Sequence, residues 1–237
     1  MGIDTGKGHG DDGLFERARH AMVADIAAEA ALTVGYTGRV RFSAPVMEVM
    51  DRVPRHEFVP DALRAYAYAN RPLPIGSDKT ISQPYMVALM TDMVNPQPGD
   101  RALEIGTGAG YQAAVLAELV EHVDTVERLA QLAEGARERL QRLGYDNVDV
   151  HVGNGYYGWP ANAPYDRIIV TAACELVPPP LIAQLKPRGR MIVPTGIPEH
   201  QTLTLVTKDA AGMLSIRELL PVRFSQLDEP GDAGGMA

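Results

Sequence analysis

The sequence predicts an α/β fold: a mostly parallel sheet with helices on both faces, an antiparallel hairpin at its C-terminal edge, and helices that precede it. Three observations lead to this prediction. Short apolar runs alternate with segments of helical periodicity from residue 84 onward, and this alternation is typical of parallel sheets. A glycine-rich turn, GTGAG, follows one apolar run at 106–110, where such folds bind nucleotides. Two strand-like runs near the C-terminus have no helix between them, which favours antiparallel pairing.

The N-terminal part of the chain is expected to be helical. Residues 14–33 carry apolar side chains at the three- and four-residue spacing of an amphipathic helix: Phe15, Ala18, Met22, Ile26 and Ala30. A second helix is expected over 44–52, with Pro45 in its first turn. Prolines interrupt the stretch 53–76, which indicates short helices and loops.

The regular part of the sheet domain begins after this stretch. Its strands are expected over 101–105, 122–126, 148–152, 166–171, 190–194, 203–208 and 214–224. Helices are expected over 84–93, 112–119, 130–143 and 179–185. We expect four parts: a disordered tail (1–13), an N-terminal helical segment (14–79) packed on the sheet domain, the sheet domain itself (80–227) and a second disordered tail (228–237). Both tails are rich in Gly and Asp and have little to bury.

Composition and charge limit the range of functions. The chain has 237 residues, with 22 Lys and Arg and 30 Asp and Glu, so its net charge is 22 − 30 = −8. This balance argues against a nucleic-acid partner, because such binding relies on cations that neutralise phosphates. The sequence has no apolar run near the roughly 20 residues of a membrane span, no signal-peptide core, and one cysteine, which suits a reducing compartment. We expect a cytoplasmic monomer that binds neither nucleic acid nor membranes.

The glycine turn has the spacing of a particular cofactor site. Glu104, Gly106, Thr107 and Gly108 belong to the run E-x-G-x-G-x-G, which is the first motif of S-adenosylmethionine-dependent methyltransferases. A dinucleotide fingerprint would need glycine where Tyr111 stands, so an NAD-linked oxidoreductase is disfavoured. The acidic Glu104 suits the cationic amino-acid end of S-adenosylmethionine. The alternative interpretation of the glycines is a tight strand–helix turn.

Two further strand ends complete the expected cofactor site. Glu127 ends the next strand, and its carboxylate can accept hydrogen bonds from both ribose hydroxyls; a solvated strand end is the alternative. Asn154 and Gly155 follow the third strand, and the Asn154 amide oxygen can accept a bond from the exocyclic amino group of adenine. The next aromatic side chains either stack near the adenine or pack in the core: Tyr156, Tyr157 and Trp159.

Taken together, the chain resembles the protein-L-isoaspartate O-methyltransferases. The resemblance covers most of 53–224, in these pieces: VPRHEFVP (53–60), PIG (74–76), TISQPYMVA (80–88), LEIGTGAGYQAAVLA (103–117), VERL (126–129), GNGYYGWP (153–160), APYDRIIVTAA (163–173), LKPRGRMIVPTG (185–196) and PVRF (221–224). TISQP and IIVTAA are specific to this family. The chain departs from it at Asn154, where aspartate is usual, and at Tyr156, where tryptophan is frequent.

The resemblance implies a Rossmann-like methyltransferase sheet that uses S-adenosyl-L-methionine and releases S-adenosyl-L-homocysteine. The acceptor would be the free α-carboxylate of L-isoaspartyl residues in damaged proteins and peptides. The resulting ester would close to a succinimide without the enzyme, and hydrolysis would return some normal aspartate. The resemblance also implies that Thr80, Ile81, Ser82 and Thr171 contact the cofactor.

The chemistry of such a transfer indicates a role for Ser82. A carboxylate is already ionised at neutral pH, so methylation needs placement and desolvation rather than a general base. The Ser82 hydroxyl and nearby backbone N–H groups can hold the carboxylate without adding a cationic charge. The alternative role for Ser82 is an N-cap on the helix that Pro84 begins, and the two roles are compatible because helix N-termini favour anions.

Other residues are expected to bind the substrate peptide. Ala172 ends the fourth strand and leaves room for a peptide backbone, while Pro194 ends the fifth strand and could form another wall. By resemblance, Val222 and Arg223 lie where main-chain bonds hold the peptide. Simple packing, or a solvated charge for Arg223, is the alternative.

Two other functions stay open. One is a related methyltransferase that makes an aspartimide in a dedicated partner peptide, although no added recognition domain is evident. The other is a non-catalytic S-adenosylmethionine-binding module, which only Asn154 invites. No metal is expected, because the six histidines show no ligand spacing.

Overall fold

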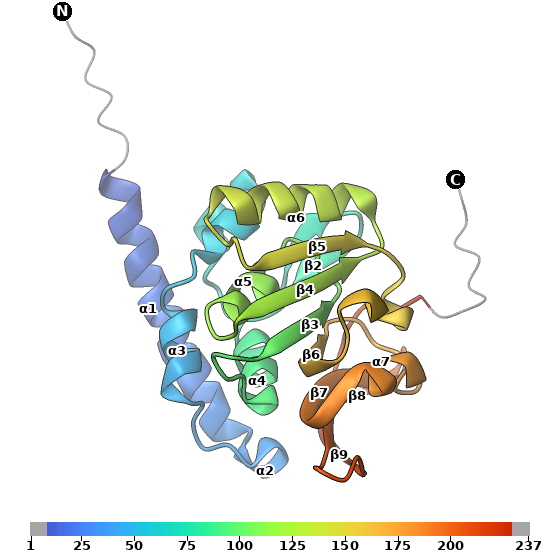
Figure 1. Ribbon diagram of the computed structural model, residues 1–237. Helices are drawn as coiled ribbons and strands as arrows, with labels where there is room; N and C mark the ends of the chain where they lie inside the picture. The colour runs from blue at the N-terminus through green and yellow to red at the C-terminus, as the bar shows by residue number, and fades with distance from the viewer. Residues whose placement is uncertain (1–8, 229–237) are drawn as a thin grey trace, which may run out of the picture.

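The computed structural model describes residues 9–228, and a seven-stranded sheet forms its centre (Figure 1). The strands are β3 (Arg101–Ile105), β4 (His122–Glu127), β5 (Val148–Val152), β6 (Tyr165–Val170), β7 (Leu185–Ile197), β8 (His200–Lys208) and β9 (Leu214–Val222). Their order across the sheet is β5-β4-β3-β6-β7-β8-β9. Neighbours from β5 to β7 are parallel, and β8 and β9 add antiparallel pairs. The predicted fold class is confirmed.

Helices cover both faces of this sheet. They are α1 (His9–Leu32), α2 (Val34–Thr37), α3 (Ala44–Met50), α4 (Pro84–Val94), α5 (Tyr111–Ala117), α6 (Ala130–Arg142) and α7 (Pro179–Gln184). Short 3-10 helices are η1 (Arg55–Phe58), η2 (Asp61–Tyr66), η3 (Gly155–Tyr157) and η4 (Pro160–Asn162). Because side chains alternate along a strand, Ala102 joins the apolar cluster under α1, α3, α4 and α5, whereas Leu103 and Ile105 join the cluster under α7. Within residues 9–228, none of the helices has the length and apolar content needed to cross a membrane.

The long first helix packs along α4 and carries the apolar stripe predicted from its spacing. Met22, Ile26 and Ala30 are buried. The helix begins at His9, so the prediction of disorder up to residue 13 is wrong for 9–13. The rest of the N-terminal tail, residues 1–8, lies outside the described residues. Of the C-terminal tail, only residue 228 is described, and 229–237 lie outside as well.

Two regions of strand were missed or shortened by the sequence patterns. A small hairpin of β1 (Leu73–Gly76) and β2 (Lys79–Ile81) forms a separate sheet before α4. Its two turn residues, Ser77 and Asp78, have φ values of 52° and 55°, and this turn lacks the glycine that usually signals it. The strands β7 and β8 are also longer than predicted, because they pair with each other across a two-residue turn.

Candidate functional site

One cavity of about 910 Å³ brings most of the predicted site residues together. It lies at the carboxyl ends of the parallel strands, where open α/β sheets bind ligands. Eleven of the fifteen predicted residues line it: Thr80, Ser82, Gly106, Gly108, Glu127, Asn154, Gly155, Thr171, Ala172, Val222 and Arg223. The residues predicted for the cofactor and those predicted for the acceptor therefore share a single space.

The first glycine of the turn is required by its surroundings. Gly106 has a φ of +94°, and an added Cβ would lie 2.4 Å from the hydroxyl oxygen of Thr171. That hydroxyl donates to the carbonyl oxygens of Ile105 (2.9 Å) and Gly106 (2.8 Å). The backbone N–H of Thr171 also donates to the Ile105 carbonyl at 2.8 Å. Thr171 thus holds the glycine turn against the end of β6 as well as lining the cavity.

Glu127 lies at the end of β4 with its carboxylate fixed by backbone groups. The N–H of Gly108 donates to one oxygen at 2.9 Å, and the N–H of Leu129 donates to the other at 3.0 Å. The residue is 8% exposed and lines the cavity. Each oxygen can accept more than one hydrogen bond, so the carboxylate is oriented and still able to accept from a diol.

Glu104 and Thr107 lie outside the cavity lining, in a buried chain of hydrogen bonds. The Thr125 hydroxyl donates to Glu104 Oε2 at 2.5 Å and lies 2.6 Å from the Thr107 hydroxyl, so Thr107 donates to Thr125. Burial raises the pKa of Glu104 to about 8; the bond from Thr125 opposes this effect, and the charge of Glu127 adds to it. Among the described residues, Glu104 Oε1 has no hydrogen-bond partner. A direct role for Glu104 toward the cofactor stays a prediction.

The loop after β5 lines the cavity with backbone rather than with aromatic rings. A Cβ on Gly155 would lie 2.3 Å from Ile105 Cγ2, so only glycine lets the loop approach β3 this closely. The Asn154 side-chain oxygen accepts from the N–H of Tyr156 at 2.9 Å, which caps η3 and uses one acceptor position. Trp159 stacks on His151 with ring centroids 4.0 Å apart. None of the three aromatic residues at 156, 157 and 159 lines the cavity, which argues against adenine stacking.

Ser82 lines the cavity between β2 and α4. Its hydroxyl makes no hydrogen bond to any described residue, whereas its carbonyl accepts a 2.7 Å bond from Arg55 Nη2. Arg55 is fully buried, also donates to the Ala67 carbonyl at 2.8 Å, and lies over the Tyr111 ring. Burial lowers the pKa of Arg55 to about 10. The N-cap of α4 is Gln83, not Ser82, so the capping alternative is wrong and the hydroxyl is available to a ligand.

Two of the predicted residues point away from the cavity. Ile81 is 5% exposed and pairs with Leu73 in the small hairpin, which places its side chain in the apolar core. Pro194 is buried in β7, and its carbonyl accepts from the N–H of Cys174 at 3.1 Å. Neither lines the cavity, so the direct contacts predicted for these two side chains are not supported by their positions.

Residues 223–228, here called the closing segment, run from β9 back across the end of β6. The N–H of Ala173 donates to the carbonyl of Ser225 at 2.8 Å, and the Ala173 carbonyl accepts from the N–H of Leu227 at 2.6 Å. The whole segment lines the cavity. Sequence patterns indicated a strand up to 224 but gave no sign of this return.

Sequence analysis also missed several charged and polar residues that line the cavity: Glu29, Lys79, Gln83, Arg128 and Asp228. Asp228 forms an ion pair with Arg128, so residue 228 belongs to the site and not to the predicted tail. Glu29 lies on the polar face of α1, where helical periodicity predicts only solvent. No local motif distinguishes these residues, because their positions depend on how distant segments pack.

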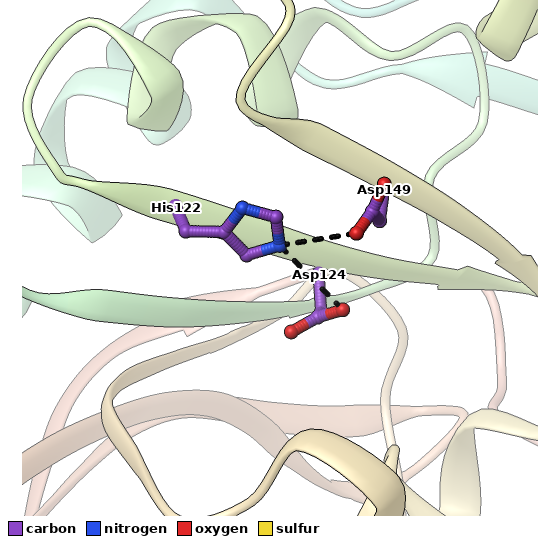
Figure 2. Close-up of side chains that lie close together, drawn as sticks. All are labelled: His122, Asp124 and Asp149. Carbon is purple, nitrogen blue, oxygen red and sulfur yellow. Dashed lines mark ion pairs between the residues drawn. The ribbon is translucent and has the colours of Figure 1, made fainter.

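Outside the cavity, His122, Asp124 and Asp149 form a cluster on β4 and β5 (Figure 2). The His122 Nε2 atom lies 3.3 Å from Asp149 and 3.8 Å from Asp124. The spacing of histidines along the sequence could not reveal this group, because the strands pair side by side. The carboxylate of Asp124 already has close polar partners: His151 at 2.7 Å, Asn162 at 2.8 Å and Tyr165 at 3.1 Å. These partners satisfy Asp124 and make the cluster a support of the sheet edge.

A glycine turn after β3, a backbone-held carboxylate at the end of β4 and a cavity above the parallel strands form a nucleotide site, and Tyr111 stands where a dinucleotide fingerprint needs glycine. These features fit an S-adenosylmethionine-dependent methyltransferase. A sequence model of the protein-L-isoaspartate(D-aspartate) O-methyltransferases matches residues 31–230. The chain belongs to this family.

Individual relatives agree with this assignment. The chain is 54% identical to "Protein-L-isoaspartate O-methyltransferase 1" of Polaromonas sp., covering 92% of this chain and 93% of the relative. It is 56% identical to a protein of the same name from Cupriavidus necator, covering 92% and 84%. A solved protein-L-isoaspartate O-methyltransferase superposes with a TM-score of 0.75 at 31% identity, covering 89% of this chain and 66% of that one. A Plasmodium falciparum structure in complex with S-adenosyl-L-homocysteine shares the fold, with a TM-score of 0.71 at 23% identity and coverage of 89% and 98%.

Proposed function

We propose that this chain transfers the methyl group of S-adenosyl-L-methionine to the free α-carboxylate of L-isoaspartyl residues in damaged proteins and peptides. The observation that carries the proposal is the shared cavity, in which the oriented Glu127 carboxylate and the free Ser82 hydroxyl are both found. The ester would close to a succinimide and allow repair to aspartate. The 54% identical relative bears the name of this activity.

The residues around the glycine turn fit the cofactor. Gly106 and Gly155 let the two loops that line the cavity pack closely on the sheet, since a Cβ would lie 2.4 Å from Thr171 at the first position and 2.3 Å from Ile105 at the second. The Glu127 carboxylate, which two backbone N–H groups orient, would accept hydrogen bonds from the ribose hydroxyls. The backbone near Asn154 and Gly155 would flank the adenine. S-adenosylmethionine supplies an electrophilic methyl group on a sulfonium sulfur.

The acceptor side fits an ionised carboxylate. Among the described residues, no histidine lines the cavity, and none is needed because the acceptor has already lost its proton. Ser82 would donate a neutral hydrogen bond to one carboxylate oxygen and leave the other free to attack. Small Ala172 and the chain at Val222 and Arg223 would leave room for the peptide backbone and hold it by main-chain bonds.

The proposal extends to the state of the protein. The enzyme would act as a cytoplasmic monomer on isoaspartyl proteins, without a nucleic-acid or membrane partner. The negative net charge supports the absence of nucleic acid, and the single, buried cysteine suits a reducing compartment. Residues 14–79 would stabilise the catalytic domain at 80–227, because Met22, Ile26 and Val46 share its apolar core. Light scattering after size-exclusion chromatography tests the monomer.

Labelled S-adenosylmethionine and paired peptides test the activity. The two peptides carry isoaspartate or normal aspartate in the same sequence. The proposal predicts a base-labile methyl ester on the isoaspartyl peptide alone. Equal labelling of both peptides would reject the assigned acceptor, and bound cofactor without any labelling would reject catalysis.

A further inference from the structure

Glu29 reaches the cavity from the N-terminal helix. It is half-buried on α1 and lines the same space as Thr80, Ser82 and Gln83. The family match begins at residue 31, so this side chain is supplied by a part of the chain that the family model does not describe. The helix therefore adds a charged group to the acceptor side of the site.

Two side-chain amides hold the Glu29 carboxylate in place. Asn70 Nδ2 donates to Oε2 at 2.8 Å, and Gln83 Nε2 lies 3.1 Å from the same oxygen and 3.4 Å from Oε1. The Asn70 side-chain oxygen in turn accepts from the N–H of Tyr85 at 3.0 Å, in the first turn of α4. Since Gln83 directly follows Ser82, the carboxylate is fixed beside the segment that would hold the acceptor.

No cation neutralises this carboxylate within the described part of the chain. The donors to Glu29 are neutral amides, and no Lys, Arg or His nitrogen lies within ion-pair distance of it. Three cations line the cavity as well: Lys79, Arg128 and Arg223. Arg128 forms an ion pair with Asp228, and neither Lys79 nor Arg223 is paired with Glu29. A half-buried charge without a counter-ion is attracted to a cation on the ligand and repels an anion.

We propose that Glu29 is a specificity-determining residue that favours isoaspartyl peptides with a cationic group next to the isoaspartate. The cation is either a Lys or Arg side chain or a free amino terminus one residue away. This proposal rests on the methyl transfer proposed above. Glu29 shifts the charge preference of the cavity toward cationic neighbours of the isoaspartate.

Peptide sets and a matched pair of variants test the proposal. Glu29→Gln removes the charge and keeps an oxygen for the amides of Asn70 and Gln83. Asp25→Asn makes the same charge change one turn earlier on α1, at an exposed position outside the cavity lining. Acetylated isoaspartyl peptides carry Lys, Ala or Glu on either side of the isoaspartate, and one further peptide has a free amino terminus beside it. The measured quantity is kcat/KM for each peptide.

The ratio to compare is kcat/KM for the better Lys peptide divided by kcat/KM for the matched Glu peptide. In Glu29→Gln this ratio should be about fivefold or more lower than in the unchanged protein, because a partly shielded ion pair is lost. Asp25→Asn keeps the original ratio. The free-terminus peptide shows which source of cation is used. An equal loss on all peptides would mean that Glu29 only holds Asn70 and Gln83 and would overturn the proposal. An unchanged ratio would also overturn it, while methylation of isoaspartyl peptides by every variant would leave the proposed function standing.

Discussion

Glu104 makes the stability of the protein depend on pH in a way that a single substitution removes. Its carboxyl is fully buried between strands and helices, and burial raises its pKa to about 8 from an ordinary value of 4.5. When folding raises the pKa of a group, its protonated form stabilises the folded state. This stabilisation is complete only at pH values below the pKa that the group has in the unfolded chain. That contribution is lost as the pH rises toward the folded pKa. The loss therefore falls between about pH 4.5 and pH 8.

The magnitude follows from the size of the shift. A difference of 8 − 4.5 = 3.5 pKa units corresponds to about 5 kcal/mol at 1.36 kcal/mol per unit. Glu104→Gln keeps the shape and can accept the bond from Thr125, but it cannot ionise. We expect the free energy of unfolding of the unchanged protein to fall by up to about 5 kcal/mol more than that of the variant between pH 4.5 and pH 8.

Urea denaturation of cofactor-free protein at several pH values measures this difference. Glu48→Gln, at an exposed position on α3, is the matched control and should leave the pH dependence unchanged. The reasoning is refuted if Glu104→Gln and the unchanged protein differ by the same free energy at pH 5 and at pH 8. It is also refuted if the variant loses stability most steeply at high pH.

Four other substitutions separate the parts of the site. Ser82→Ala should lower kcat by about 10²-fold, because the acceptor is misplaced, while the Kd for S-adenosylhomocysteine should stay within about twofold. A change in that Kd without a change in kcat would contradict the role of Ser82. Glu127→Ala should raise that Kd by roughly 10–100-fold through loss of charged hydrogen bonds, as calorimetry would show. Gly106→Ala should weaken cofactor binding and destabilise the fold by ~1–2 kcal/mol or more, because alanine disfavours positive φ; unchanged melting would contradict this. Arg55→Lys should reduce kcat more than cofactor affinity, since one ammonium cannot bridge the carbonyls that Arg55 holds, and a mutant with normal kcat would show that Arg55 serves stability alone.

The fold was predictable because its elements have strong local patterns. The apolar runs of β3, β4 and β6 and the stripe of α1 depend on periodicity within a few residues, and the glycine turn has a fixed spacing. The β1–β2 hairpin was missed because Ser77 and Asp78 adopt positive φ without a glycine. The start of α1 at His9 was missed because the preceding composition resembles that of a disordered tail.

The site was predictable where residues follow a strand and not where they depend on packing. Gly106, Glu127 and Thr171 converge because parallel strands end at one edge of the sheet. Glu104 lies on β3, two residues before Gly106, but its side chain is fully buried and bonded to Thr125 on the neighbouring strand, so it does not line the cavity. Glu29 required knowledge of how α1 lies against α4, which no local pattern contains.

The closing segment also makes Cys174 a natural chemical reporter. The thiol is fully buried, and the preceding residue, Ala173, is bonded through both its N–H and its carbonyl to the closing segment. A thiol reagent can reach Cys174 only when this region separates, so the rate of alkylation measures how often it opens. Since the sequence has no other cysteine, the unmodified protein gives this signal from one defined position, and mass spectrometry with and without S-adenosylhomocysteine would follow it without an added label.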